Sequence, residues 1–385
     1  MDFDLDEAQQ VIAASVADVL GSAARGSEPP DGAADWLATW QALAKAGLLA
    51  LTLPEWMDGD GLGVLDTAVL LTEVGRRAVV VPALATLMLG TLPVVRWGSR
   101  DLQERVLTGV GTGEVILTAG VREPSTGMPA WPATTADLAA GPAGGEDPAG
   151  SGLAGTVTGL KIGVPFAADA RWMLVPAALA AGGRAVVVVD ASAEGVSVAA
   201  TPASSAVPEY TVRLDAAPVA GVLGTGSATG TTSAAVDDLY LLAACGAAAL
   251  ADGAMAGALA LTAGYVAGRE QFGRPLATFQ AVAGQIADVY IASRTLHLAA
   301  LSACWRLASG RDAAQDAGIA AYWLAQEGPV ALRTCHQLHG GIGMDVGYPL
   351  HRYSSMVSDL ARFVGGADYR LELLADHTDL GAQCS

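Results

Sequence analysis

The chain has 385 residues, of which 52% are hydrophobic and 16% are charged, with 39 acidic and 21 basic side chains. A chain this apolar does not stay disordered, and its length suffices for two or three domains with large cores. The net charge of −18 disfavours nucleic acid as a partner, because a polyanion attracts basic surfaces. It does not exclude a phosphorylated cofactor, which needs only one or two cations and a helix N-terminus.

The first 114 residues predict helices, because apolar residues recur three and four positions apart. This spacing covers residues 5–20, 36–48 and 64–74, with Gly- and Pro-containing turns between them. We therefore expect an N-terminal helical domain over residues 1–114.

The pattern changes near residue 115, where short apolar runs alternate with turn residues and predict a small β-barrel or sandwich over residues 115–225. Residues 133–155 and 221–232 are low in complexity, so we expect a flexible loop and a domain boundary there. The predicted strands are Val115–Val121, Val157–Val164, Trp172–Val175, Ala185–Val189, Val196–Ala199 and Tyr210–Leu214.

Helical spacing returns near residue 236 and predicts a helical bundle over residues 226–385. Its clearest stripe runs from Phe279 to Leu296, with Ser293 as the one polar member. Residues 241–268 are long enough to span a bilayer and contain a single charge, Asp252. They consist mostly of Ala and Gly and lack basic flanks and an aromatic belt, so we expect a buried helix. A helix that is apolar on every side packs on several partners, which suggests an oligomer.

Compartment and metal binding follow from the cysteines and the N-terminus. Cys245, Cys304, Cys335 and Cys384 are widely spaced, without CxxC pairs, which fits a reducing compartment. The acidic N-terminus has no basic signal-peptide region, so we expect a cytoplasmic protein. We expect no metal site from the cysteines and histidines near residue 335, because no further ligand lies nearby in sequence.

Residues 268–280 place cations, amides and aromatic rings between two long predicted helices. A loop that leads into a helix N-terminus favours an anionic ligand, and Arg269 or Arg274 could hold a pyrophosphate with two hydrogen bonds. An ordinary helix–turn–helix with solvated arginines is an equal alternative on chemistry alone. A second segment, residues 335–344, ends a predicted helix in Gly340 and Gly341, which suit a close approach of backbone to a ligand.

Together the two segments resemble the acyl-CoA dehydrogenase family, whose last domain carries the signatures R-x-Q-F-G-x-P-x-x-x-F-Q and Q-x-x-G-G-x-G. The helix–strand–helix order and the opening Met1-Asp2-Phe3 also match, so the resemblance covers the whole chain. It implies an α+β fold with an N-terminal helical domain, a small middle β-barrel and a C-terminal four-helix bundle. It also implies FAD as cofactor and removal of two hydrogens between Cα and Cβ of an acyl-CoA.

In this family the two signatures contact the FAD of a neighbouring subunit, so the resemblance implies the same role here. The implied cofactor-binding residues are Arg269, Gln271, Phe272, Gln280, Gln337, Leu338, His339, Gly340 and Gly341.

The positions that carry the catalytic base depart from the family. The family's usual base is a Glu before Gly-Thr, and Gly365 stands at that position. A minority places a Glu early in the first helix of the last domain, where this chain has Leu239. Asp238 is one residue away, which turns a side chain by about 100° around a helix. We therefore expect no catalytic residue in this chain, with Asp238 as the fallback.

The flavin cradle departs as well. The family motif T-E-P-x-x-G-S-D has Arg122 in place of its Thr, and Met128 and Pro129 in place of Ser-Asp. The next strand continues after Lys161 without the aromatic and hydroxyl residues that normally face the flavin. The chain thus keeps the half that reaches a neighbour's FAD and lacks the half that would hold its own.

Residues 82–87 and 343–354 are similar to the α subunits of two-chain actinobacterial acyl-CoA dehydrogenases that act on steroid side chains. This resemblance implies a heterotetramer with a β subunit that carries the catalytic Glu, a steroid acyl-CoA substrate and an electron-transfer flavoprotein as acceptor. From charge, composition and the lack of a ligand cluster, we expect no nucleic acid, membrane or metal partner. Two alternatives stay open: a self-sufficient homo-oligomer with a displaced base, and a catalytically silent scaffold or acyl-CoA-binding subunit.

Overall fold

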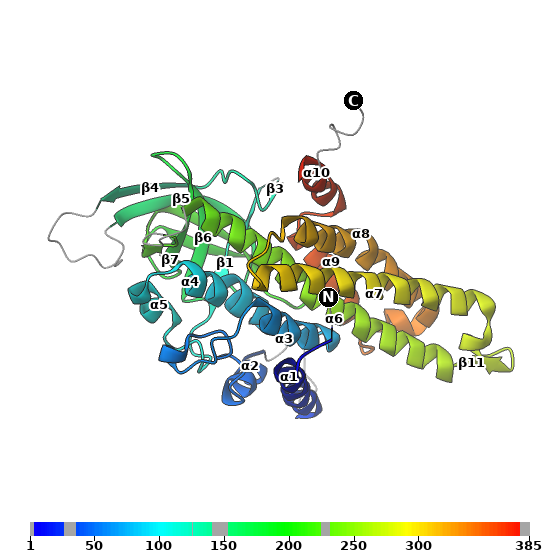
Figure 1. Ribbon diagram of the computed structural model, residues 1–385. Coiled ribbons are helices and arrows are strands. Elements are labelled where there is room, and N and C mark those ends of the chain that lie inside the picture. The colour runs from blue at the N-terminus through cyan, green and yellow to red at the C-terminus, as the bar shows by residue number, and fades with distance from the viewer. Residues whose placement is uncertain (1–3, 27–35, 125, 141–152, 225–231, 378–385) are drawn as a thin grey trace.

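The computed structural model describes residues 4–26, 36–124, 126–140, 153–224 and 232–377. Figure 1 shows the strands of the middle segment gathered at one end of the molecule, while the long helices of the C-terminal part extend to the other end. The α+β class and the predicted order of helices, sheet and helices are confirmed.

The N-terminal helix α3 (Val64–Arg76) packs along the first long helix of the C-terminal part, α6 (Thr232–Gly268). A Cβ on Gly75 would lie 2.0 Å from the carbonyl oxygen of Leu250, and one on Gly253 would lie 1.9 Å from that of Thr72. Glycine is therefore required on both helices for this close approach. The N-terminal elements are α1 (Glu7–Gly26), α2 (Trp36–Lys45), η1 (Glu55–Met57), α3 (Val64–Arg76), the π-helix η2 (Leu84–Thr91), α4 (Leu92–Trp97) and α5 (Arg100–Leu107).

The middle segment forms an eight-stranded sheet whose described strands follow the path β10-β7-β6-β4-β5-β9-β8, with β1 paired in parallel to β6. All six predicted strands are present. The flexible loop predicted over residues 133–155 is wrong where β4 forms, because Ala- and Thr-containing backbone pairs in register with β5; residues 141–152 of it lie outside the described residues. Likewise, β10 forms at the start of the predicted boundary segment. The strands are β1 (Leu117–Ala119), β2 (Arg122–Glu123), β3 (Thr126–Gly127), β4 (Thr135–Ala140), β5 (Leu153–Pro165), β6 (Trp172–Leu179), β7 (Arg184–Asp190), β8 (Val196–Thr201), β9 (Glu209–Pro218) and β10 (Gly221–Val222).

The C-terminal segment is a bundle built around α6. Within the described residues α6 alone is long and apolar enough to cross a membrane, but 83% of its most apolar window is buried inside the fold. The expectation of a buried helix is thereby confirmed. The remaining elements are β11 (Glu270–Gln271), β12 (Arg274–Pro275), η3 (Leu276–Thr278), α7 (Gln280–Ala308), α8 (Ala314–His339), η4 (Gly340–Met344), α9 (Leu350–Phe363) and α10 (Ala367–His377).

The α6 and α7 helices run side by side to the end of the molecule marked by β11 (Figure 1). The apolar residues predicted to form one face of α7 differ in burial along the helix. The later members Val289, Ser293 and Leu296 are buried, whereas Val282 and Ile286 are only half-buried. The outer half of the pair therefore presents apolar surface that this chain alone does not cover.

Candidate functional site

The tip of the α6–α7 pair is a two-residue hairpin between β11 and β12. Gln271 pairs with Arg274, which leaves Phe272 and Gly273 as the central turn residues with φ of +55° and +77°. This left-handed pair is typical of a type I′ turn, where Asn-Gly is preferred and a bulky residue is strained. The turn nevertheless holds Phe272 with 92% of its surface exposed. Strain that presents an apolar ring to solvent is characteristic of functional sites.

Two arginines flank this hairpin, and the structure distinguishes them. The guanidinium of Arg274 lies 4.1 Å from the ring centroid of Phe279, in a cation–π contact within the hairpin. Arg269 follows the last turn of α6, where its backbone N–H donates to the carbonyl of Tyr265, and its side chain is exposed. Arg269 is thus better placed than Arg274 to meet an external anion. Gln271 and Gln280 are also exposed.

The second segment ends α8 and begins η4. Gln337, Gly340 and Gly341 are exposed, and no atom lies within 4 Å of a Cβ built on either glycine. Another molecule can therefore approach this backbone closely. Leu338 and His339 are buried at 8% and 3% exposure, so their side chains face the interior. The implied cofactor contact of these two residues is restricted to their backbone.

The structure brings the two segments together through Tyr265, one helical turn before Arg269. The Tyr265 ring stacks on the His339 ring with centroids 4.5 Å apart, and its hydroxyl donates to the His339 carbonyl at 3.3 Å. The two sequence signatures therefore belong to one surface, although about 70 residues separate them along the chain.

The family resemblance assigns the chain's own flavin to the β2–β3 turn, and in this structure that turn is closed by a contact with the α9–α10 junction. A Cβ on Gly127 would lie 2.9 Å from the Cα of Gly365, so the β2–β3 turn touches the α9–α10 junction. Tyr369 donates to the carbonyl of Met128 at 3.1 Å, and Arg370 donates to its sulfur. A planar ring needs roughly 7 Å between the atoms on its two faces, at about 3.5 Å for each contact. The residues present at this contact do not fit a flavin ring.

Charged side chains fill the neighbouring space. Arg122 lies against Gly163, whose Cβ would be 2.5 Å from its Nη1. Glu209 accepts a hydrogen bond from Arg362, which also donates to Asp359. Burial, together with the positive charge of Arg362, lowers the pKa of Arg122, and burial raises the pKa of Glu209. The adjoining cavity measures about 60 Å³, far below the roughly 300 Å³ of a small ligand pocket.

Neither family position offers a free base. Gly365 has a φ of +96°, and a Cβ there would lie 2.4 Å from the Tyr369 ring. A glutamate at this position would strain the backbone and collide with its neighbour. The fallback residue, Asp238, accepts two hydrogen bonds from Arg96 at 2.8 Å and one from Trp97 at 2.7 Å. It is 6% exposed and fastens α6 to α4, so its carboxylate is occupied.

Beside the closed turn lies a buried ion pair. Lys161 on β5 donates to Glu123 at 2.6 Å, and their side chains are 1% and 3% exposed. Glu123 also accepts from the backbone N–H groups of Ala133 and Thr134. Burial lowers the pKa of Lys161 to about 8, while the Glu123 carboxylate opposes this shift. The pair fixes the β2–β3 turn on the sheet.

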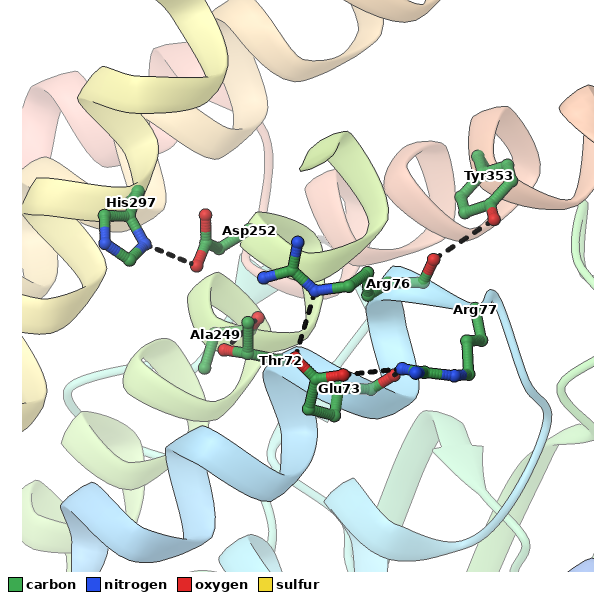
Figure 2. A network of polar contacts seen from close by, with 8 residues as sticks. All are labelled: Thr72, Glu73, Arg76, Arg77, Ala249, Asp252, His297 and Tyr353. Carbon is green, nitrogen blue, oxygen red and sulfur yellow. Dashed lines mark hydrogen bonds and ion pairs between the residues drawn. The ribbon is translucent and has the colours of Figure 1, made fainter. Parts of the chain in front are cut away.

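A larger cavity of about 230 Å³ lies between α1, α3, α6 and α7. Figure 2 shows Asp252 of α6 pointing toward His297 of α7, with Oδ2 and Nδ1 2.9 Å apart. On α3, Glu73 accepts from Arg76, whose backbone carbonyl accepts from Tyr353 of α9 at 3.1 Å. These contacts join α6 to α7 and α3 to α9, and they account for Asp252, the single charge within residues 241–268.

The sequence did not point to the residues that close the space beside the β2–β3 turn. It also did not point to Tyr265, which joins residues 268–280 to residues 335–344. Tyr265 could have been found, because it lies four residues before Arg269 and so on the same side of the helix. Arg362 and Tyr369 carry no such signal, since Glu209 and Met128, to which they donate across the fold, are more than 100 residues away in the chain.

Comparison with known proteins agrees with this architecture. Residues 5–114 match the acyl-CoA dehydrogenase N-terminal domain, and residues 242–376 match the acyl-CoA dehydrogenase C-terminal domain. The chain is 44% identical over 385 residues to acyl-CoA dehydrogenase FadE28 of Mycobacterium tuberculosis, covering 100% of this chain and 99% of that protein. It is 32% identical over 340 residues to FadE27 of the same organism, covering 86% and 85%.

Solved structures show the same fold over nearly the full length. A Tcur3481–Tcur3483 steroid ACAD matches with a TM-score of 0.86 and 33% identity, covering 98% of this chain and 99% of that one. The ChsE4–ChsE5 complex from Mycobacterium tuberculosis matches with a TM-score of 0.85 and 28% identity, covering 98% of each chain. Domain matches, full-length identity and fold agree, and the chain therefore belongs to the acyl-CoA dehydrogenase family.

Proposed function

We propose that this chain is the α subunit of a two-chain, FAD-dependent acyl-CoA dehydrogenase. The enzyme would introduce a Cα–Cβ double bond into a steroid side-chain CoA thioester, of the kind that 3-oxo-4-pregnene-20-carboxyl-CoA represents. The chain supplies contacts to the pyrophosphate and adenosine of FAD, and its partner supplies the flavin cradle and the catalytic Glu. The similarity to a steroid ACAD and to the ChsE4–ChsE5 complex supports both the substrate class and the second chain.

The observation that carries the proposal is the contrast between the two halves of the site. The place for the chain's own flavin, between the β2–β3 turn and the α9–α10 junction, is closed by the contact of Gly127 with Gly365. By contrast, residues 268–280 at the tip of α6 and α7, called the Arg269 arm below, leave the Arg269 side chain exposed. Apolar side chains beside the arm and the second segment are exposed as well: Phe272 at 92%, Met344 at 82% and Val346 at 84%. Apolar surface of this kind marks a surface that a partner covers.

The chemistry divides accordingly between the two chains. FAD bound in the shared site would supply the hydride acceptor for dehydrogenation of the thioester. Arg269 neutralises and orients the pyrophosphate, because a guanidinium matches its oxygens with two hydrogen bonds. The open Gly340–Gly341 backbone allows the cofactor to approach without a steric barrier. Proton abstraction from Cα is left to the partner, since the carboxylate of Asp238 is already saturated.

The first test is flavin content and native mass, measured on the chain alone and after co-expression with the β chain. The expected result is one FAD per heterodimer and a heterotetramer in the complex, with no flavin in the chain alone. Full flavin and turnover in the chain alone, lost on Asp238→Asn, would establish the self-sufficient homo-oligomer instead. A complex without flavin would establish the silent scaffold.

The second test addresses the division of roles. Arg269→Ala in the complex is expected to release flavin, even though the catalytic Glu lies in the other chain. The matched control is Arg213→Ala, which removes an exposed arginine on β9, outside both signature segments. Full flavin retention in the Arg269 variant would contradict the proposed pyrophosphate contact. In this proposal the complex resides in the cytoplasm and passes its electrons to an electron-transfer flavoprotein.

A further inference from the structure

We propose that His339 is a positioning residue, which holds the Gly340–Gly341 backbone and the Arg269 arm in the one arrangement that binds FAD. It does so as the middle member of a three-ring cluster with Tyr265 and Tyr348. This inference deepens the proposed function and rests on it.

The cluster is buried and its hydrogen bonds are complete. His339 is 3% exposed; its Nδ1 lies 2.8 Å from the carbonyl oxygen of Cys335, and its Nε2 lies 3.0 Å from the hydroxyl of Tyr348. A carbonyl only accepts, so Nδ1 carries the hydrogen, and in the neutral ring Nε2 accepts from the Tyr348 hydroxyl. Both ring nitrogens are therefore occupied within the chain, and neither is free to contact a cofactor.

The three rings come from three separate parts of the C-terminal domain. Tyr265 belongs to the end of α6, His339 to the end of α8, and Tyr348 to the segment between η4 and α9. The His339 ring is stacked on Tyr265 and lies 5.2 Å from the Tyr348 ring. The arm that carries Arg269 and the segment that carries the glycine pair are thus joined through one imidazole.

The backbone next to His339 shows why its position matters. Gly340 has a φ of +62° and a ψ of −138°, a conformation that residues with a Cβ rarely adopt. A glycine pair is flexible by itself, so a close backbone approach to a ligand needs a rigid anchor beside it. The His339 ring, held by two hydrogen bonds and one stacked contact, is that anchor.

Protonation of His339 should loosen the cluster. Burial lowers the pKa of His339 below its ordinary value of 6.5; the hydrogen bond to Cys335 opposes this shift, and nearby His336 adds to it. Among the described residues, the titratable groups that face the ring are Tyr265 and Tyr348, and His336 lies nearby. The neutral form is fully stabilised above about pH 6.5, and this contribution is lost as the pH falls through the lowered pKa. Flavin affinity should weaken over the same range.

The test measures the dissociation constant for FAD of the complex from pH 5.5 to 8, for wild type and for His339→Phe and His339→Asn. His339→Phe keeps a ring but loses both hydrogen bonds, so we expect at least tenfold weaker binding at pH 7.5, without the acid-dependent loss. His339→Asn retains a donor toward Cys335 and should restore part of the affinity. A purely structural residue would change the melting temperature without removing the pH dependence.

A milder variant tests the inference in case the His339 variants do not fold. Tyr348→Phe removes one hydroxyl and should weaken FAD binding by a few fold, whereas Tyr322→Phe, on α8 outside the cluster, should leave it unchanged. The inference fails if folded His339 and Tyr348 variants bind FAD like wild type with the same pH profile. Arg269→Ala, measured beside them, separates the two levels: if it loses flavin while they keep it, only the inference fails, and if all keep it, the proposed function fails.

Discussion

Gly365 shows at the scale of a single residue how the fold disfavours a glutamate at the position that the family resemblance assigns to the base. Its φ of +96° lies in the region that favours glycine, and the Tyr369 ring occupies the space of a Cβ. Its neighbour Gly366 also has a positive φ, of +85°, but faces open space. Substitutions at these two adjacent glycines can therefore distinguish the cost of backbone strain from the cost of a steric clash.

We predict that Gly365→Ala lowers the free energy of unfolding by more than Gly366→Ala does. Both variants force a side chain into a left-handed conformation, at about 1–3 kcal/mol. Only the Gly365 variant also displaces Tyr369. Chemical denaturation of the isolated chain measures the free energy of unfolding of both variants. An equal decrease in the two would show that the Tyr369 ring moves aside at little cost. Gly365→Glu is expected to give no dehydrogenase activity in the chain alone.

The Lys161–Glu123 pair is a second feature that acts through single residues. Removing one partner leaves an uncompensated buried charge, which costs about 3–5 kcal/mol. We predict this loss of unfolding free energy for Lys161→Met, measured by denaturation at pH 7. The double variant Glu123→Gln with Lys161→Met should recover part of it, because no charge then remains buried. Equal stability of the single and double variants would contradict this explanation.

The hairpin at the tip of α6 and α7 combines local backbone strain with an exposed aromatic ring. Phe272 occupies a turn position that prefers Asn; its ring is 92% exposed and lies against Phe279, with 6.2 Å between the ring centroids. Burying such a ring in another subunit contributes about 1.5–3 kcal/mol. In the proposed complex, burial of this ring would offset the strain of the turn.

We predict that Phe272→Asn has opposite effects on the chain and on the complex. The isolated chain should become more stable, because Asn adopts the left-handed turn conformation more readily. The complex should dissociate more readily, because the buried ring is lost. Melting temperature of the chain and equilibrium dissociation of the complex measure the two effects. Phe272→Ala is the control that loses the ring without the turn preference, and unchanged association in both variants would contradict a role in the interface.

At the scale of the whole molecule, contacts of the strand domain with α9 and α10 link the middle segment to the last two helices. The β2–β3 turn is held to the α9–α10 junction by Tyr369 and Arg370, while Asp359 of α9 accepts from the backbone of Ser204 and Ser205. The isolated chain should therefore be folded and stable without cofactor.

We predict that the isolated chain does not retain FAD when it is mixed with excess cofactor and passed through a desalting column. Its melting temperature should also be unchanged by FAD, because a ligand stabilises only the state it binds. The complex measured in parallel is the positive control. A rise in melting temperature of the chain alone would show that the closed contact opens at low cost.

Much of the fold could be predicted because it depends on local pattern. Helical spacing located α1, α3 and α7, and alternating apolar runs located the six predicted strands. The strand β4 was missed because its Ala-rich sequence resembles a linker, and only pairing with β5 makes it a strand.

The sequence by itself determined the family, the two segments around Arg269 and Gly340, and the absence of a glutamate at both base positions, because these are properties of residue identity and spacing. Only the tertiary structure decided that Asp238 is saturated by Arg96 and Trp97, that His339 faces inward, and that the turn before Met128 closes on Gly365. Each of these depends on contacts between segments about 70 to 240 residues apart, which chain order does not encode locally.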